Sequence, residues 1–376
     1  MKKRIKIDLL FNEFPLTNQM YIYDLLQKLN GENVLDLSVT CDTKLTLDSS
    51  LKIVKIPSYY YRKLYEKCIR LVNSNYKNLS YIEIKWLQNH TDIIHIHHSH
   101  LINKVGDILN LKKENRPKIV VTLRGSDTYI KPWYFKTWKH YYKDYFPEID
   151  ALIVQSEHQK NYLITIWEVD EQIIHVIPSS IKASISLPEK RLEDTIKIVS
   201  SFRMCWEKNI EGNIRVIRVL VDKGYNVRYD IYGYGQDLGQ VYYLIDKFNL
   251  KSYINVKGKV ANSQYLEALK NYDFYLQLSI VESLSISVIE AQSKGIPAIV
   301  SDSSGILETI KPNESGFAVP YYNVEMAAEK IIDLINNQTK YFEFSTEAIQ
   351  HVNSKYTNDI ESEKHLELYE KLVEKE

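Results

Sequence analysis

The sequence predicts an α/β protein made of two Rossmann-like domains. Short apolar runs alternate with stretches of helical periodicity along the chain, and strands that alternate with helices favour parallel βαβ units. At 376 residues the chain is too long for one typical core and long enough for two. We expect a first domain over residues 1–180 and a second over 196–355, with a linker at 178–195, where proline, serine and charged residues interrupt the apolar pattern.

Apolar and aromatic runs mark the expected strands. In the first half they are 5–11, 34–39, 51–56, 92–97, 118–123 and 151–155. In the second half they are 197–201, a run ending at 231–235, and 273–279. Residues 285–294 are typical of a helix that Gly295 and Pro297 end. The last segment, 356–376, has the pattern of a charged amphipathic helix.

Composition narrows the class of protein. The formal net charge of zero gives no support to nucleic-acid binding. Cys41, Cys68 and Cys205 show neither pairing nor metal-ligand spacing, which favours a reducing compartment without structural disulfides. The apolar run at the start is too short for a signal peptide, and no stretch is apolar enough to span a bilayer. We therefore expect a cytoplasmic protein.

Two carboxylates, Glu282 and Glu290, flank the start of the expected helix after 273–279. If that helix begins near Ser283 to Ser285, the backbone N–H groups there form an anion site that suits a phosphate. Eight helical steps span about 12 Å, so Glu282 could reach a donor sugar and Glu290 the ribose of a nucleoside diphosphate sugar. The alternative interpretation is two ordinary helix glutamates.

Cations and glycines follow two other expected strands. Arg203 and Lys208 come after 197–201, and the turn Gly233-Tyr234-Gly235 ends its own strand. Because ligands of parallel α/β sheets bind beyond the carboxyl ends of the strands, we expect these residues near the glutamate helix. Two cations beside a helix N-terminus would hold a diphosphate.

The stretch 198–320 resembles the C-terminal domain of retaining glycosyltransferases of the GT-B fold, glycosyltransferase family four. The matching segments include Ser-Phe-Arg-Met-Cys-Trp-Glu-Lys (201–208), Ile-Tyr-Gly-Tyr-Gly (231–235), Val-Lys-Gly-Lys-Val (256–260), Ser-Ile-Val-Glu-Ser (279–283), Val-Ile-Glu-Ala (288–291) and Gly-Ile-Pro-Ala-Ile-Val (295–300). The resemblance implies two domains facing across a cleft, with the acceptor in the first and a nucleotide sugar in the second. It implies no metal cofactor, donor contacts by 233–235 and by a lysine beside Gly258, and a C-terminal helix (356–376) that crosses back to the first domain.

The resemblance also implies a reaction, which is transfer of a hexosyl group to a hydroxyl acceptor with retention of configuration. Arg203, Lys208 and the N–H groups of Leu284 and Ser285 would stabilise the leaving diphosphate. Glu282 would orient the sugar and Glu290 the ribose. The family suggests bacterial surface polysaccharide or glycoconjugate synthesis.

Three other functions are alternatives to this reaction. A nucleotide-sugar epimerase and a catalytically silent scaffold or binding subunit stay open as alternatives. A dinucleotide-dependent oxidoreductase is excluded, because no Gly-x-Gly-x-x-Gly follows the first strand.

On the acceptor side, the segment Thr122 to Asp127 matches a family motif in which a histidine commonly occupies the place of Arg124. Arginine stays protonated and cannot act as a general base, so Arg124 would stabilise the departing phosphate or bind an anionic acceptor. The alternative is that Arg124 pairs with Asp127 and holds the loop. We expect His97 or His98 at the acceptor and His95 packed inside. No carboxylate or cysteine pattern accompanies these histidines, so a metal is not expected.

Two further features concern ligands. The first loop has no glycine pair, so Thr17 and Asn18 are expected to contact the donor instead. Segments 59–70 and 131–145 combine lysines with Tyr and Trp, as interfacial helices do. We therefore expect peripheral contact with the inner face of the plasma membrane through 131–145, the alternative being a half-buried helix on the sheet. The expected partners are a nucleotide sugar and a glycan or lipid-linked acceptor.

Overall fold

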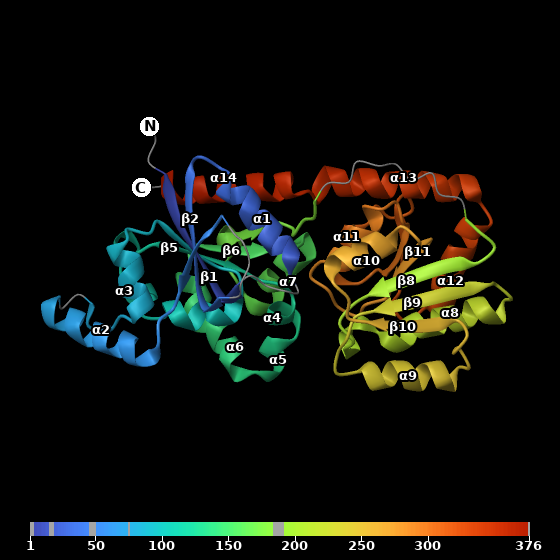
Figure 1. Cartoon of the computed structure of the whole chain (residues 1–376), viewed down its shortest axis with the longest axis horizontal. Helices are drawn as coiled ribbons and strands as arrows, with labels where there is room; N and C mark the ends of the chain where they lie inside the picture. The colour runs from blue at the N-terminus through green and yellow to red at the C-terminus, as the bar shows by residue number, and fades with distance from the viewer. Residues whose placement is uncertain (1–3, 15–18, 45–49, 74–75, 183–191, 375–376) are drawn as a thin grey trace. The chain divides into compact units, whose positions relative to one another are not determined.

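The computed structural model describes residues 4–14, 19–44, 50–73, 76–182 and 192–374 (Figure 1). Contacts divide the chain into two compact units. Unit 1 comprises Met1–Pro178 with Asp359–Glu376, and unit 2 comprises Ser179–Asn358. The end of the chain therefore belongs to the same unit as its beginning.

Unit 1 is a parallel sheet with the strand order β3-β2-β1-β4-β5-β6-β7. Its strands are β1 (Ile5–Phe14), β2 (Leu35–Lys44), β3 (Lys52–Lys55), β4 (Ile93–Ile96), β5 (Lys118–Thr122), β6 (Ala151–Val154) and β7 (Ile174–Val176). Its helices are α1 (Met20–Asn30), α2 (Tyr59–Val72), α3 (Tyr81–Gln88), α4 (Ser126–Tyr129), α5 (Lys131–Tyr134), α6 (Lys136–His140), α7 (Glu157–Trp167) and α14 (Asn358–Glu374).

Both faces of the unit 1 sheet are covered, because neighbouring strand residues pack into different cores. Leu9 belongs to the cluster that α1 and α14 complete with Leu25 and Tyr369. Leu10 belongs to the cluster on the other face. Strands buried on both faces favour apolar residues, so β5 and β6 show in the sequence as nearly continuous apolar runs, whereas β1 and β2 also carry polar residues such as Asp8 and Asp36.

Unit 2 is a parallel sheet with the strand order β10-β9-β8-β11-β12-β13. Its strands are β8 (Ile196–Ser201), β9 (Val227–Tyr232), β10 (Ile254–Gly258), β11 (Phe274–Gln277), β12 (Ala298–Ser301) and β13 (Gly316–Val319). Its helices are α8 (Ile210–Asp222), α9 (Leu238–Lys247), α10 (Asn262–Leu269), α11 (Ile286–Gln292), α12 (Val324–Ile335) and α13 (Gln338–Lys355). Ile198 and Val199 pack into clusters on opposite faces of this sheet.

The order of the strands identifies where each sheet can bind a ligand. In unit 2 the chain runs outward from β8 in one direction to β10 and in the other direction through β11 to β13. The loops after β8 and β11 therefore diverge at a topological switch point, where open α/β sheets bind ligands. In unit 1 the corresponding neighbours are β1 and β4.

The predicted α/β class with two parallel sheets is confirmed, and the strands expected from apolar runs are present within a few residues. One prediction is wrong. Residues 131–145 do not form one amphipathic helix but the short helices α5 and α6 and a π-helical turn at Tyr141–Tyr145. Phe135 is extended between α5 and α6, which breaks the helix, and Trp138 is buried in the unit.

Candidate functional site

A lysine and a glutamate meet at the switch point of unit 2. Lys208 ends a 3₁₀ turn (Trp206–Lys208) after β8, and Glu282 lies in the loop after β11. The Lys208 ammonium pairs with the Glu282 carboxylate, and the two side chains are only 13% and 14% exposed. Gln277, the last residue of β11, donates to the same carboxylate oxygen at 2.9 Å. The pair is thus held in a largely dry setting, where charge interactions are strong.

The backbone of Glu282 is fixed as well. Its N–H donates to the Ser304 hydroxyl at 2.8 Å, and its carbonyl accepts from the N–H of Gly305 at 2.9 Å. Ser304 begins a 3₁₀ helix (Ser304–Thr309) that follows β12. Loops from two neighbouring strands therefore hold Glu282 from both sides.

The second predicted cation, Arg203, is paired too. Its guanidinium donates to the Glu207 carboxylate at 2.6 Å, and Glu207 is buried whereas Arg203 is 64% exposed. The pKa of Glu207 is lowered: burial alone would raise it, but hydrogen bonds from Cys205 and Arg203 and the nearby guanidinium charge outweigh that effect. Lys208 and Arg203, the two cations predicted to bind the diphosphate, thus each pair with a different glutamate.

Glu290 behaves differently from Glu282. It lies in α11, is buried, and accepts one hydrogen bond of 3.1 Å from Asn262 at the start of α10. Burial raises the pKa of Glu290 to about 8, and the charge of Lys294 only partly offsets this. At neutral pH the side chain is therefore mostly a neutral acid, which can donate as well as accept a hydrogen bond.

The segment between the two glutamates is only partly helical. Ser283, Leu284 and Ser285 are buried, and α11 begins after Ser285. The expectation of eight helical steps between Glu282 and Glu290 is therefore wrong, because Glu282 precedes the helix by several residues. Ser285 donates through its hydroxyl to Gln277 at 3.0 Å, so this segment is tied to β11.

The glycines after β9 serve close backbone packing. A Cβ on Gly233 would lie 2.0 Å from the carbonyl oxygen of Phe202, and one on Gly235 would lie 2.1 Å from that of Met204. Gly233 also has φ of 119°, which side chains disfavour. Both glycines let the loop after β9 lie against the loop that carries Arg203, while Tyr234 between them is exposed.

The segment around Gly258 is tied to the same edge of the sheet. The Gly233 N–H donates to the Gly258 carbonyl at 2.9 Å. The Lys257 ammonium lies 3.2 Å from the Asp230 carboxylate, whereas Lys259 is exposed.

In unit 1, Asp127 organises the loop after β5. Its carboxylate accepts from the backbone N–H groups of Arg124 and Gly125 at 2.8 to 3.1 Å and from the Ser99 hydroxyl at 2.5 Å. The carboxylate thus binds the backbone N–H groups of Arg124 and Gly125. Asp127 is buried, and its part in this geometry is to shape the loop.

The Arg124 guanidinium lies beside His97 and Tyr21. One guanidinium nitrogen is 3.3 Å from Nδ1 of His97, and the group lies 5.6 Å from the centre of the Tyr21 ring. Because a guanidinium only donates, Nδ1 of His97 must accept, which places the ring proton on Nε2. His97 is buried, and its Nε2 has no hydrogen-bond partner within the described ranges.

A column of buried histidines stands behind Arg124. The His97 ring stacks on Phe11 at 4.9 Å and on His95 at 4.0 Å, and His95 stacks on His365 of α14 at 5.8 Å. Burial, more than the neighbouring charges, lowers the pKa of His95 and His97 well below the usual value and that of His365 to about 4. All three rings are therefore neutral at pH 7.

His95 is fixed at both ring nitrogens. Its Nδ1 lies 2.7 Å from the Tyr369 hydroxyl of α14, and its Nε2 lies 2.7 Å from the Thr122 hydroxyl of β5. His98 lies beyond β4 and contacts Gln19 at 3.2 Å, and burial lowers its pKa to about 4. Thr17 and Asn18, the other expected ligand contacts of the first loop, lie outside the described residues.

Two features sought elsewhere in the molecule do not add to these groups. In the described ranges, no set of three or more His, Cys, Asp or Glu side chains is arranged to hold a metal ion. Nor does any helix of those ranges combine the length and apolarity needed to cross a bilayer.

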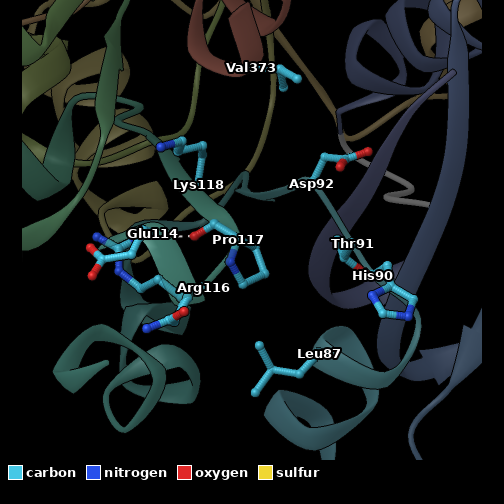
Figure 2. Close-up of a pocket in the computed structure, with 10 residues that line it drawn as sticks. Leu87, His90, Thr91, Asp92, Glu114, Arg116, Pro117, Lys118 and Val373 are labelled. Atoms are coloured by element: carbon cyan, nitrogen blue, oxygen red, sulfur yellow. Dashed lines mark hydrogen bonds between the residues drawn. The ribbon is translucent and has the colours of Figure 1, made fainter. Parts of the chain in front are cut away.

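Figure 2 shows a pocket at the other edge of the unit 1 sheet, between the starts of β4 and β5, where Asp92 and Lys118 lie. Ligands of open α/β sheets bind beyond the carboxyl ends of the strands, which is the opposite edge. Arg116 in this pocket is occupied by Asp150 and by the carbonyls of Pro117 and Glu148. The pocket is therefore a weaker candidate than the switch points.

Several residues of these sites were not found from the sequence. Gln277 and Ser304 hold Glu282, Asn262 contacts Glu290, and Tyr369 fixes His95. A single glutamine at the end of an apolar strand was a usable signal for Gln277, because a buried amide needs partners. The others depend on contacts between distant segments, which spacing does not reveal.

Two family models match adjacent parts of the chain. The model described as Glycosyltransferase Family 4 matches residues 20–184, and the one described as Glycosyl transferases group 1 matches 184–351. A poly(ribitol-phosphate) α-N-acetylglucosaminyltransferase of Staphylococcus aureus is 25% identical over 264 residues, 70% of this chain and 52% of that protein. A putative colanic acid biosynthesis glycosyltransferase of Escherichia coli is 25% identical over 38% of this chain and 37% of its own length. The chain thus spans about half of the first of these relatives and less of the second.

Solved structures share the fold at low identity. A sucrose-phosphate synthase of Thermosynechococcus elongatus matches with a TM-score of 0.75 at 15% identity, over 99% of this chain and 100% of that one. A TarM variant of S. aureus, solved with fondaparinux, α-GlcNAc-glycerol and UDP, matches with a TM-score of 0.64 at 23% identity, over 74% of this chain and 55% of that one. Anabaena HepE, solved with UDP and glucose, matches with a TM-score of 0.73 at 14% identity, over 97% and 99%.

Proposed function

The chain belongs to the GT-B glycosyltransferases, and on that premise we propose that it transfers a hexosyl group from a nucleoside diphosphate sugar to a hydroxyl acceptor. The observation that carries the proposal is the Lys208–Glu282 pair at the switch point of unit 2. Solved relatives of this fold hold UDP, which supports a uridine diphosphate sugar as the donor. The surface-glycan enzymes among the relatives support a bacterial cytoplasmic role in surface polysaccharide or glycoconjugate synthesis.

The two cations act on the leaving group. When the bond between the anomeric carbon and the diphosphate oxygen breaks, negative charge grows on the diphosphate, and Lys208 and Arg203 stabilise it. Their glutamate partners hold both cations near the switch point before the donor arrives, and a phosphate replaces part of that pairing when the donor binds. Arg203 is the more exposed of the two and can swing from Glu207 to a phosphate.

Glu282 and Glu290 act on the two ends of the donor. Glu282 accepts hydrogen bonds from sugar hydroxyls and favours positive character at the anomeric carbon. Glu290 accepts from the ribose hydroxyls. The acceptor oxygen bonds to the anomeric carbon on the face that the diphosphate leaves, and a diphosphate oxygen takes the acceptor proton. Configuration is therefore retained without a protein base.

Unit 1 supplies the acceptor side. Arg124 and the Nε2–H of His97 are donors near the end of β4 and the loop after β5. Both suit an acceptor rich in oxygen, and Arg124 favours an anionic one. Trp133, Tyr134 and Phe135 are exposed beside lysines, which supports peripheral contact of this unit with the inner face of the plasma membrane.

The test is nucleotide binding followed by turnover. Melting temperatures of the wild type, Glu290→Ala and Arg203→Ala are compared with UDP, GDP and ADP, because a ligand that binds the native state raises its melting temperature. We expect a shift with UDP that both variants reduce. UDP release from UDP-sugars is then measured with and without glycan acceptors. Absence of a shift with any nucleotide would instead favour the silent scaffold, and epimerised donor without acceptor would favour the epimerase.

A further inference from the structure

One buried hydroxyl of unit 2 has no partner. Tyr265 lies in α10 and is only 5% exposed, and its hydroxyl makes no hydrogen bond with any residue that the structure describes. Burial raises the pKa of Tyr265 well above its usual value, and the nearby Ser201 hydroxyl, which acts in the opposite direction, does not meet the geometry of a hydrogen bond. Buried polar groups of native proteins are nearly always paired, because an unpaired one costs free energy, so this hydroxyl needs an explanation.

Tyr265 lies on the side of α10 that meets Glu290. Asn262 precedes it by three positions, and residues three apart share a face of a helix. Asn262 donates to the Glu290 carboxyl at 3.1 Å, so this face of α10 contacts α11 (Figure 1). The Tyr265 ring packs edge-on against Tyr232, the last residue of β9, at 5.2 Å. Burial, Tyr275 and the Glu290 carboxylate, in that order, raise the pKa of Tyr265, so the phenol and the carboxyl are close enough to interact.

The charged form of Glu290 has few hydrogen-bond donors. Three titratable groups face it, namely Lys294 from its own helix, Tyr265 from α10 and Tyr275 from β11. Lys294 only partly offsets the effect of burial on the pKa of Glu290. The Tyr275 hydroxyl is already bonded to two polar side chains, at 2.8 and 3.0 Å. Besides Asn262, which donates now, Tyr265 is therefore the described neighbour with a hydroxyl to spare.

We propose that Tyr265 is a positioning residue for the donor: its hydroxyl donates to the Glu290 carboxylate when a nucleoside diphosphate binds and Glu290 releases its proton to solvent. The neutral acid needs no such donor, which explains why the hydroxyl is unpaired in this structure. A donor to the ionised carboxyl stabilises it and holds it in place for the ribose hydroxyls. This inference rests on the proposed function, in which Glu290 binds the ribose.

The first test is the pH dependence of the affinity for UDP, measured by calorimetry. A hydrogen bond to the charged form lowers the pKa of an acid, so in Tyr265→Phe the rise of affinity with pH should have its midpoint about one pH unit above that of the wild type. The affinity of the variant should be about fivefold to tenfold lower at pH 7 and about twofold lower or less at pH 9. The matched control is Tyr341→Phe, a buried tyrosine of unit 2 whose hydroxyl donates to the Asp273 carbonyl at 3.1 Å, and it should change neither quantity.

A double variant shows whether Tyr265 acts through Glu290. In the Glu290→Gln background, Tyr265→Phe should leave the affinity for UDP within about twofold, because no carboxylate remains to be held. A full additional loss in that background would mean that the hydroxyl contacts the nucleotide itself, and the proposal would then be wrong.

Stability without nucleotide separates this inference from the proposed function. At pH 6, where Glu290 keeps its proton, Tyr265→Phe should not lower the melting temperature, because it removes an unpaired hydroxyl, whereas Tyr341→Phe should lower it. Between pH 6 and pH 9 Tyr265→Phe should lose more stability than the wild type, because the buried carboxylate has lost a donor. That greater loss without any binding of UDP would uphold the pairing of Tyr265 with Glu290 and reject the proposed function.

Two further results would overturn the inference alone. One is binding of UDP to the wild type with an unchanged midpoint in Tyr265→Phe, which would leave the proposed function intact. The other is a melting temperature of Tyr265→Phe that is lowered at pH 6 as much as that of Tyr341→Phe. The hydroxyl would then already have a partner, such as Ser201, and would not be held for Glu290.

Discussion

The two sheets place opposite chemistry at their carboxyl edges. In unit 2 the edge is ionic, with Lys208 paired to Glu282 and Arg203 to Glu207. In unit 1 the edge is a buried column of imidazoles that burial keeps neutral, with Arg124 at its end. The same topology therefore supports a site for a strongly charged ligand in one unit and a largely uncharged, hydrogen-bonding site in the other.

The difference lies in how each unit stabilises its buried polar groups. Unit 2 uses charge pairs. A diphosphate can bind there by replacing a glutamate as the partner of a cation. Unit 1 uses neutral donors and acceptors in series, from Tyr369 through His95 to Thr122. Such a network fixes the geometry of neutral hydrogen-bonding groups, and Arg124 at its end adds a positive charge.

The largest expected effect comes from removing the central cation of unit 2. Lys208→Met should lower kcat about 100- to 1,000-fold, because the diphosphate loses charge stabilisation in the transition state. It should also lower the free energy of unfolding by about 3 kcal/mol, because Glu282 stays buried without its partner. Kinetics of UDP release and denaturant titration measure the two effects.

Lys340→Met is the control, because Lys340 also pairs with a carboxylate of unit 2, Asp333, and neither residue belongs to the expected donor site. It should leave kcat within about twofold of the wild type. Equal losses of kcat in both variants would mean that Lys208 affects activity only through the stability of the fold. The charged edge of unit 2 would then have no catalytic role.

The next largest effect is expected at Arg124, the cation beside the buried histidines of unit 1. Arg124→Lys should lower kcat/KM for the acceptor about tenfold, because lysine lacks the planar fork that donates to His97 and to a ligand together. Arg124→Ala should lower it about 100-fold. The UDP-induced melting shift should persist in both, since unit 2 is unchanged. Wild-type kinetics in Arg124→Ala would show that the residue only shapes its loop.

The strands could be predicted well from the sequence and the contacts of the site less well, and the reason is physical. Strands buried on both faces favour apolar residues, so they show as local runs. Asp127 accepts from the backbone N–H groups of Arg124 and Gly125, whereas an ion pair with the Arg124 side chain was the alternative that the sequence left open. Hydrogen bonds to backbone depend on loop conformation, which no spacing rule gave.

The sequence also did not reveal side-chain partners that lie far apart in the chain, for a related reason. Gln277 and Tyr369 serve residues from other elements, and in the case of Tyr369 the partner His95 lies 274 positions away in the chain. The state of Glu290 escaped too, because burial depends on the packing of α10 and α11. The pattern of Glu282 and Glu290 located the segment and gave each carboxylate its own part of the donor, but it did not show that burial raises the pKa of Glu290.

Replacing Glu290 with glutamine should have opposite effects on nucleotide binding and on stability. Because its folded pKa is about 8, above the usual 4.5, the folded state holds a proton that the unfolded state loses, and stability falls as pH rises from about 4.5 to 8. Glu290→Gln removes that loss, so it should be more stable than the wild type by about 3–5 kcal/mol at pH 9. It should also bind UDP more weakly, because an amide cannot become a charged acceptor.

The affinity of the wild type for UDP should change with pH for the same reason. Ribose hydroxyls favour the ionised carboxylate, so the affinity should rise about fivefold to tenfold between pH 7 and pH 9, and Glu290→Gln should show no such rise. Calorimetry in buffers of different ionisation enthalpy would detect the proton released. An affinity that is flat in pH for the wild type would place Glu290 away from the nucleotide.

pH should also separate the stabilities of the two units. His95, His97, His98 and His365 have lowered pKa values, so the unfolded chain binds more protons than the folded one below about pH 6.5. Unit 1 should therefore lose stability as pH falls from 7 to 5. Asp8, whose pKa burial raises to about 6, acts in the opposite direction but is outnumbered.

Tryptophan fluorescence can follow unit 1, because Trp86, Trp133, Trp138 and Trp167 lie in it and only Trp206 lies in unit 2. The denaturant midpoint of that signal should fall between pH 7 and pH 5. Over the same range a label on unit 2, at Tyr242→Cys in a Cys68→Ser background, should report equal or greater stability, because folded Glu290 holds a proton that the unfolded chain lacks between about pH 4.5 and 8. Parallel shifts of both signals would mean that the two units unfold together, and the electrostatic contrast between their edges would then have no consequence for stability.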